Sequence, residues 1–148
     1  MSNEFLREQL QRSLVDDGTI RPPNKGLLHA ELSHAIVGAC IEVHRHVGPG
    51  QLEAVYQKAL ALELRERGIA FRPQVPLAMT YKGQPIGEFY ADFIVDENIV
   101  IELKAVDHIL PAHVAQVISY LRAARLRLGL LINFNGAVLW RNVKRIVL

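Results

Sequence analysis

Cysteine is almost absent from this chain, because Cys40 is the single cysteine among 148 residues. One cysteine cannot close an internal disulfide, and without a cysteine cluster there is no reason to expect a zinc site. Chains that lack a disulfide framework are typical of reducing compartments. We therefore expect a cytoplasmic protein.

Long apolar runs are missing as well. The N-terminus carries acidic and polar residues where a signal peptide would need an apolar segment, and no window reaches the roughly 20 apolar residues that span a bilayer. Half of the residues are hydrophobic and 22% are charged, which is the balance of an ordinary globular protein. We therefore expect a soluble protein without a membrane partner.

The chain also lacks a strong excess of charge of one sign. Its formal net charge is +2 at pH 7 and its pI is about 8.9, which permits a polyanionic partner without requiring one. The last third is locally basic. These cations could contact phosphates, or they could form a solvated helix face and a charged edge strand. They are Arg122, Arg125, Arg127, Arg141, Lys144 and Arg145.

The length fits one domain, 27–148, preceded by a separate segment, 1–26. Apolar residues recur at helical spacing between Phe5 and Leu14, and a Pro-Pro pair near residue 22 then breaks the pattern. We interpret residues 1–26 as a loosely held tail with one short helix and a linker. The alternative is a docking or dimerisation arm.

Periodicity and turn residues in 27–148 predict the order α-α-β-β-β-α-β-β. Such an order predicts an α/β fold in which helices pack on a central mixed sheet. The dipeptide Asn135-Gly136 predicts a tight hairpin between the last two strands. The expected helices are 30–47, 51–67 and 111–126, and the expected strands are 70–81, 86–95, 99–104, 128–134 and 137–147.

The most informative segment is the predicted hairpin 86–104. A three-residue turn at 96–98 would pair Val95 with Ile99, which sets Asp92 opposite Glu102 on one sheet face. Lys104 lies two residues beyond Glu102 and shares that face. The alternate residues would point into a core on the other side, so the charges are expected on one face and the apolar side chains on the other.

Two facing carboxylates repel each other unless they share a proton or a cation. Mg²⁺ prefers one or two carboxylates together with waters and phosphate oxygens, and the Leu103 carbonyl offers one more oxygen. Lys104 could then orient the attacking water or stabilise charge on phosphorus. The alternative is a solvated sheet face on which Glu102 pairs with Lys104.

Two helices add polar side chains to this set. Glu53 and Tyr56 share a face in the first turn of the second helix, where a carboxylate also suits the helix dipole. Gln116 and Tyr120 lie four residues apart on the third helix, with His113 one turn earlier. Each could also be an ordinary residue at the edge of an apolar stripe.

Together these residues resemble the PD-(D/E)XK nuclease superfamily, and within it the GxxExxY family. The family's naming motif stands at 50–56 as Gly-Gln-Leu-Glu-Ala-Val-Tyr, and the metal motif stands as Asp92 followed by Glu102-Leu103-Lys104. A QxxxY helix appears as Gln116 to Tyr120, and an "LLINF" strand follows at 130–134. The resemblance spans about 27–148.

The resemblance implies a restriction-endonuclease-like αβββαβ core that binds Mg²⁺ or Mn²⁺ and hydrolyses phosphodiester bonds by metal-activated water attack. Asp92 and Glu102 would be metal ligands, Lys104 the catalytic lysine, and Glu53 a further acid at the metal. Gln116 and Tyr120 would line the site and orient Lys104 or the phosphate. Tyr90 departs from the family pattern, since such proteins often carry a basic residue there.

We therefore expect a metal-dependent nuclease that acts on nucleic acid, with DNA as the first choice. The competing hypothesis is a nucleic-acid-binding or protein-interaction module that keeps the fold without useful turnover. A purely structural subunit would leave the acidic cluster as an unexplained cost. Because a domain this small offers little surface for sequence recognition, a homodimer or a protein partner is plausible.

Overall fold

The computed structural model describes residues 27–148, and their elements follow the predicted order. They are α2 (Ala30–Val47), α3 (Glu53–Glu66), β1 (Phe71–Tyr81), β2 (Gln84–Val95), β3 (Ile99–Lys104), α4 (Pro111–Ala124), β4 (Leu128–Asn133), the 3-10 helix η1 (Leu139–Asn142) and β5 (Val143–Val147). The helix expected near the N-terminus falls in residues 1–26, outside the described part of the chain.

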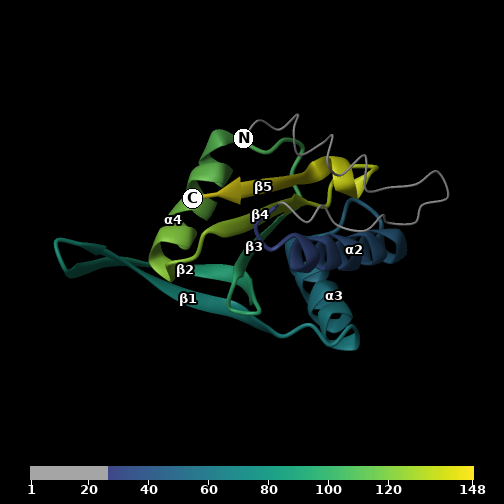
Figure 1. Ribbon diagram of the computed structural model, residues 1–148. Helices are drawn as coiled ribbons and strands as arrows, with labels where there is room; N and C mark the ends of the chain where they lie inside the picture. The colour runs from purple at the N-terminus through teal and green to yellow at the C-terminus, as the bar shows by residue number, and fades with distance from the viewer. Residues whose placement is uncertain (1–26) are drawn as a thin grey trace.

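Five strands form one mixed sheet in the order β1-β2-β3-β4-β5. Neighbouring strands are antiparallel except β3 and β4, which are parallel and are connected through α4. Helices α2 and α3 lie on one side of the sheet and α4 on the other (Figure 1). The predicted α/β class, with helices packed on a central mixed sheet, is confirmed.

Both faces of the sheet are apolar, and here the sequence-based expectation was wrong. Phe93, Ile101 and their alternate neighbours pack under α2 and α3, as expected. Ile94 and Val100, however, are buried on the opposite face under α4. The acidic residues therefore share a largely apolar face with a packed helix, because a strand in the middle of a three-layer fold has no solvent-exposed side.

Gly129 lets α4 pack closely on that face. A Cβ atom at this position would lie 2.6 Å from Cγ1 of Val117 and 3.4 Å from Cδ1 of Leu121, two buried residues of α4. The absence of a side chain on β4 thus fixes how near the helix lies to the sheet. The distance matters for function because α4 also carries Gln116 and Tyr120.

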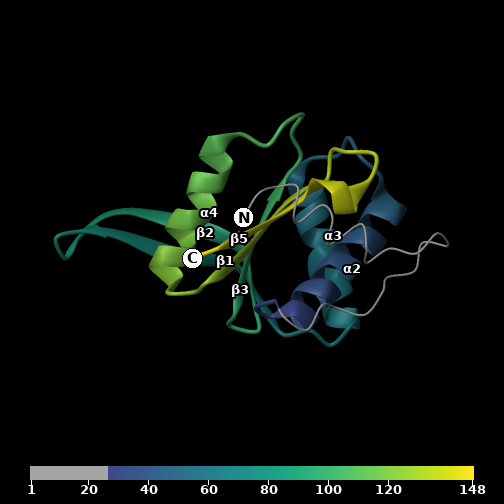
Figure 2. The same cartoon turned by 45° about the horizontal axis from the view of Figure 1, so that its top comes forward.

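The sheet divides at Asp92. Strand β2 pairs with β3 over three positions, from Val95 to Phe93, and beyond them it pairs with β1 alone. The β1–β2 ribbon then leaves the body of the protein as a projecting hairpin (Figure 2). Gln74, opposite this point on β1, has a positive φ of 47°.

The ribbon also twists where the sheet divides. Phe93 packs under α2 and α3, whereas Ala91, which would share its face in a flat strand, packs under α4. Val75 and Leu77 of β1 likewise belong to the α4 side, although Phe71 lies against the other cluster. A strong twist at Gln74 and Asp92 therefore carries one face of the ribbon from one side of the sheet to the other.

The predicted Asn-Gly hairpin is wrong. Strands β4 and β5 pair from Leu128 with Val147 to Ile132 with Val143, so residues 134–142 form a long connection that contains η1. Phe134 is fully buried and stacks on Tyr56 with ring centroids 4.4 Å apart. The carbonyl of Gly136 bonds to Nε2 of His44 at 2.8 Å. Packing against α2 and α3 thus takes these residues out of the ladder.

Within residues 27–148, no helix is both long enough and apolar enough to cross a membrane.

Candidate active site

Asp92 fills the gap where β2 leaves β3. Its Oδ2 accepts a hydrogen bond of 2.8 Å from the backbone N–H of Leu103, which has lost its partner on β2. Its Oδ1 lies 3.5 Å from Nε2 of Gln74 on β1. Burial raises the pKa of Asp92, and the hydrogen bond from Leu103 opposes that rise. The carboxylate therefore replaces a backbone group at the split in the sheet.

Glu102 is the most perturbed acid of this site. The residue is 5% exposed, and its Oε2 has no hydrogen-bond partner within the described residues. Burial, followed by the negative charge of Asp92, raises the pKa of Glu102 to about 8, and the charge of Lys104 opposes the rise. A buried carboxylate oxygen without a partner is costly, and a bound cation or a proton would relieve that cost.

Lys104 supplies the nearest positive charge. Its Nζ lies 3.6 Å from Oε1 of Glu102, and its side chain is 15% exposed. The distance exceeds that of a good hydrogen bond, so the ammonium group balances charge without being held tightly. Lys104 is the last residue of β3, and its carbonyl accepts a hydrogen bond of 2.8 Å from the N–H of Phe134.

The QxxxY pair of α4 faces the two acids. Tyr120 is 3% exposed, and its pKa is raised to about 12 by burial and then by the charges of Glu102 and Asp92. A hydrogen bond with Gln116 opposes that rise. The structure thus brings five of the candidate residues together: Asp92, Glu102, Lys104, Gln116 and Tyr120.

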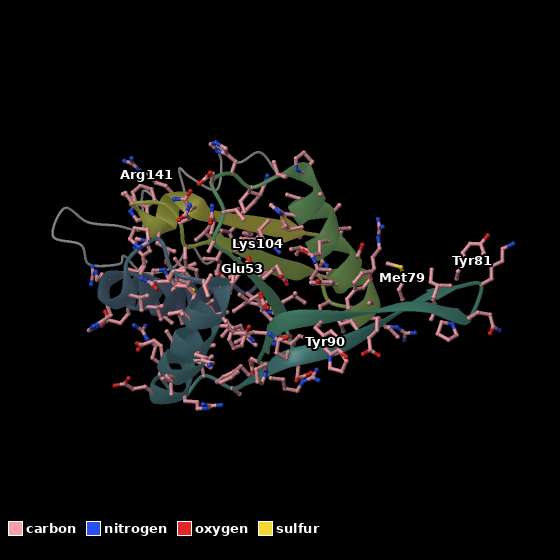
Figure 3. All side chains as sticks on the ribbon, turned by 180° about the vertical axis from the view of Figure 1, so that it is seen from behind. Glu53, Met79, Tyr81, Tyr90, Lys104 and Arg141 are labelled. Carbon is pink, nitrogen blue, oxygen red and sulfur yellow. The ribbon has the colours of Figure 1, made fainter. Side chains whose placement is uncertain are left out.

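Glu53 is the first residue of α3 and is exposed. Helix α3 packs on β3, and Figure 3 shows Glu53 toward the centre of the molecule, in the same part of the view as Lys104. The structure records no hydrogen bond or ion pair that ties Glu53 to the acid pair. In the described part of the chain, no three His, Cys, Asp or Glu residues lie close enough to form a metal cluster.

Tyr56 has a structural role that its place in the GxxExxY motif did not indicate. The ring is fully buried, and its hydroxyl donates a hydrogen bond of 2.6 Å to the carbonyl of Gly48. The same oxygen accepts a hydrogen bond of 3.2 Å from the N–H of Gln51. Gly48 and Gly50 both have positive φ, so Tyr56 holds the turn that leads into Glu53.

His113 caps α4. Its Nδ1 accepts a hydrogen bond of 2.9 Å from the N–H of Leu110, the residue before the helix. A ring nitrogen that accepts from the backbone is not free to receive another donor. The capping bond explains how α4 begins cleanly although Leu110 has no polar side chain.

Two polar residues that support the site, Asn133 and Gln74, were not among the residues predicted from the sequence. Asn133 is buried at the end of β4, where its Nδ2 donates to the carbonyl of Val106 at 2.8 Å and its Oδ1 accepts from the N–H of Val106 at 3.1 Å. It therefore fixes the segment that follows Lys104. The sequence did contain a signal for Asn133, because it is a polar residue directly after the apolar run 128–132. Gln74, beside Asp92, carried no signal in the sequence.

The donor set fits a divalent cation. Asp92 and Glu102 supply hard oxygen ligands, and one of those oxygens has no other partner in the described structure. Leu103 adds its carbonyl. Because the Lys104 carbonyl points away from β2 to the N–H of Phe134, just after β4, the backbone groups of Leu103 point toward β2, past the last paired position.

A comparison with protein families completes this picture. The model of the PD-(D/E)XK nuclease superfamily matches residues 30–146. The chain belongs to the PD-(D/E)XK nuclease superfamily. The matched segment covers all the described helices and the acid pair, and it ends within β5. Neither the curated proteins nor the solved structures include a significant match to this chain.

Proposed function

We propose that this protein is a divalent-metal-dependent nuclease that hydrolyses phosphodiester bonds of nucleic acid, with DNA as the preferred substrate. One observation carries the proposal: Glu102 is buried with an unpartnered oxygen, next to Asp92 and 3.6 Å from Lys104. A purely structural ion pair with Lys104 would leave the cost of that unpartnered oxygen unexplained. We also propose that the chain belongs to the GxxExxY family, which its motif at 50–56 supports, and that it is cytoplasmic, which its single, buried cysteine supports.

Asp92, Glu102 and the Leu103 carbonyl would hold Mg²⁺ or Mn²⁺, and Glu53 would contribute through water. When bound, such an ion lowers the pKa of a coordinated water and stabilises negative charge on phosphorus. Loss of either carboxylate should therefore abolish turnover.

Lys104 has the geometry of a group that acts on the reacting phosphate. It is the last residue of its strand and is held 3.6 Å from Glu102, so its ammonium can move toward a substrate oxygen without leaving a strong hydrogen bond. Placed there, it orients the attacking water and stabilises the charge that develops on phosphorus. Gln116 keeps the Tyr120 hydroxyl oriented beside the acids.

The test is cleavage of labelled single-stranded and double-stranded DNA, and of RNA, with Mg²⁺, Mn²⁺ or EDTA. Wild type is compared with Glu102→Gln, which removes the charge and keeps the shape. Glu97→Gln is the matched control, because Glu97 lies in the same hairpin but is exposed and paired with Arg72. We expect metal-dependent cleavage that Glu102→Gln abolishes and Glu97→Gln retains.

Folded wild-type protein that binds nucleic acid but cleaves no substrate with either metal would refute the nuclease. That outcome would favour the competing hypothesis of a binding module on the same fold. Cleavage that survives Glu102→Gln would place the catalytic site elsewhere.

A further inference from the structure

A second polar hollow lies beyond the end of the catalytic strand. It has a volume of about 220 Å³ and lies between the segment after β3, the end of β4 and the η1–β5 segment. It is lined by Asp107, His108, Ile109, Asn133, Arg141, Asn142, Val143 and Lys144. The acid pair does not line it, so the hollow is separate from the candidate active site.

Two cations in this hollow have no acidic partner in the described structure. Arg141 and Lys144 form no ion pair within residues 27–148, and Arg141 is exposed. The Arg141 guanidinium lies over the ring of Trp140, 5.1 Å from its centroid, which orients it. Two other basic residues of the C-terminal third are already engaged: Arg145 bonds to Ser33 and Leu28, and Arg127 bonds to the carbonyl of Leu148.

The one acid in the hollow, Asp107, already accepts a hydrogen bond. Oδ1 of Asp107 accepts a hydrogen bond of 3.2 Å from Nδ2 of Asn135. Asn133 is held by the backbone of Val106, so the floor of the hollow is fixed. The hollow therefore presents two cations, Arg141 and Lys144, that have no acidic partner in the described structure, and its acid is already hydrogen-bonded. Such a site suits an anion with several acceptor oxygens.

The sheet register places this hollow at a useful distance from the acid pair. Glu102 pairs with Leu131, and Leu131 pairs with Lys144, so Glu102 and Lys144 lie in one row across three strands and on the same face. With strands about 4.8 Å apart, the two Cα atoms are roughly 10 Å apart. This separation is short enough for one nucleic-acid strand to contact both places.

Figure 3 shows the same order across the molecule for Lys104 and Arg141. Figure 3 shows Arg141 at the η1 end of the molecule, with Lys104 between it and the projecting hairpin that carries Tyr81. The register also sets Asn133 directly beside Lys104. A strand that passes Lys104 can therefore continue over the end of β4 into the hollow.

From this arrangement we infer that the hollow lined by Arg141 and Lys144 binds a phosphate group of the nucleic-acid strand, close to the cleaved bond. The inference rests on the proposed function for its choice of substrate. It adds a phosphate-binding site that holds the strand in register with the acid pair. Phosphate contacts of this kind position a strand without reading its sequence.

The test measures binding of a fluorescein-labelled single-stranded DNA by anisotropy, in EDTA so that no cleavage occurs. Arg141→Gln/Lys144→Gln should weaken binding about tenfold or more, since a hydrogen bond to a charged group is worth roughly that much. It should also make the negative slope of log affinity against log salt shallower by about 1.4, as expected for the loss of two phosphate contacts to a single strand. Arg141→Gln alone, an exposed change that leaves the fold intact, should give a partial loss.

Two comparisons separate a phosphate site from general attraction. Lys58→Gln/Arg65→Gln removes the same charge from the exposed face of α3 and should change affinity less than twofold. Asp107→Asn should tighten binding, because it removes the acid from the hollow. Equal losses in the two double variants, or weaker binding with Asp107→Asn, would overturn the inference. If inorganic phosphate at millimolar concentration binds wild type but not Arg141→Gln/Lys144→Gln, while both proteins bind DNA equally, the hollow takes free phosphate in place of a strand and the inference is overturned.

Cleavage kinetics distinguish the failure of this inference from that of the proposed function. If wild type cleaves DNA and the Arg141→Gln/Lys144→Gln variant cleaves with unchanged KM, the phosphate site is refuted and the nuclease stands. If no variant cleaves but this double variant selectively loses binding, the site stands and the nuclease is refuted.

Discussion

Removing the charge of Glu102 should stabilise the metal-free protein at neutral and alkaline pH. The perturbation is Glu102→Gln, which keeps the side chain's shape and hydrogen-bonding capacity but cannot ionise. In the folded protein, burial and the charge of Asp92 raise the pKa of Glu102 from 4.5 to about 8. The folded state therefore holds a proton that the unfolded state releases between these two pH values.

The sign and size of the effect follow from this difference. Below pH 4.5 the group is neutral in both states, so it carries no penalty; as pH rises from 4.5 to 8, the folded state loses stability relative to the unfolded state. At 1.36 kcal/mol per pKa unit the penalty reaches at most about 5 kcal/mol. Because Glu102→Gln also loses the attraction of Lys104, we expect a net gain of about 1–3 kcal/mol at pH 8.

Urea unfolding in EDTA at pH 5 and pH 8 measures this directly. The difference between Glu102→Gln and wild type should be small at pH 5 and favour the variant at pH 8. Glu97→Gln should be the less stable protein at both pH values, because a hydrogen bond from Arg72 lowers the pKa of Glu97 and favours its charged form, whose contribution is lost only below pH 4.5. If Glu102→Gln is the less stable protein at pH 8, or if its advantage does not depend on pH, the account of Glu102 is wrong.

Three further predictions concern the site and its supports. Lys104→Ala should reduce kcat by more than tenfold while Mg²⁺ still raises the melting temperature, whereas loss of both would make Lys104 structural. Tyr56→Phe should destabilise the protein by about 1–2 kcal/mol, because it removes the hydroxyl bonded to Gly48 and keeps the ring stacked on Phe134; chemical denaturation measures this, and no change would refute the role of Tyr56 in the turn. Gly129→Ala should cost roughly 1–3 kcal/mol, because its Cβ would lie 2.6 Å from Cγ1 of Val117; an unchanged melting temperature would show that α4 can shift freely.

Much of the fold could be predicted because its patterns are local. The helical stripe of α2 and the strand alternation on both sides of residues 96–98 identified the elements, and the pairing of Val95 with Ile99 follows from the length of that turn. The same alternation by two residues placed Asp92, Glu102 and Lys104 together. The roles of these side chains in catalysis remain predictions that the proposed assays test.

Other features could not be read from local patterns because they depend on partners distant in the sequence. Asn135-Gly136 has the composition of a tight hairpin, but burial of Phe134 against Tyr56 outweighs that local preference. Nothing in the sequence near Gln74 indicates that it lies beside Asp92, since the two residues meet only through pairing of β1 with β2.

The sequence by itself determined the order of most elements and which side chains share a face on either side of residues 96–98, because periodicity follows from backbone geometry. Tertiary structure decided the chemistry. Packing of α4 over β3 buries Glu102 and raises its pKa, while the departure of β2 from β3 leaves the Leu103 N–H for Asp92 to accept. Burial and electrostatic environment are properties of assembled layers, so they appear only once the sheet has a helix on each face.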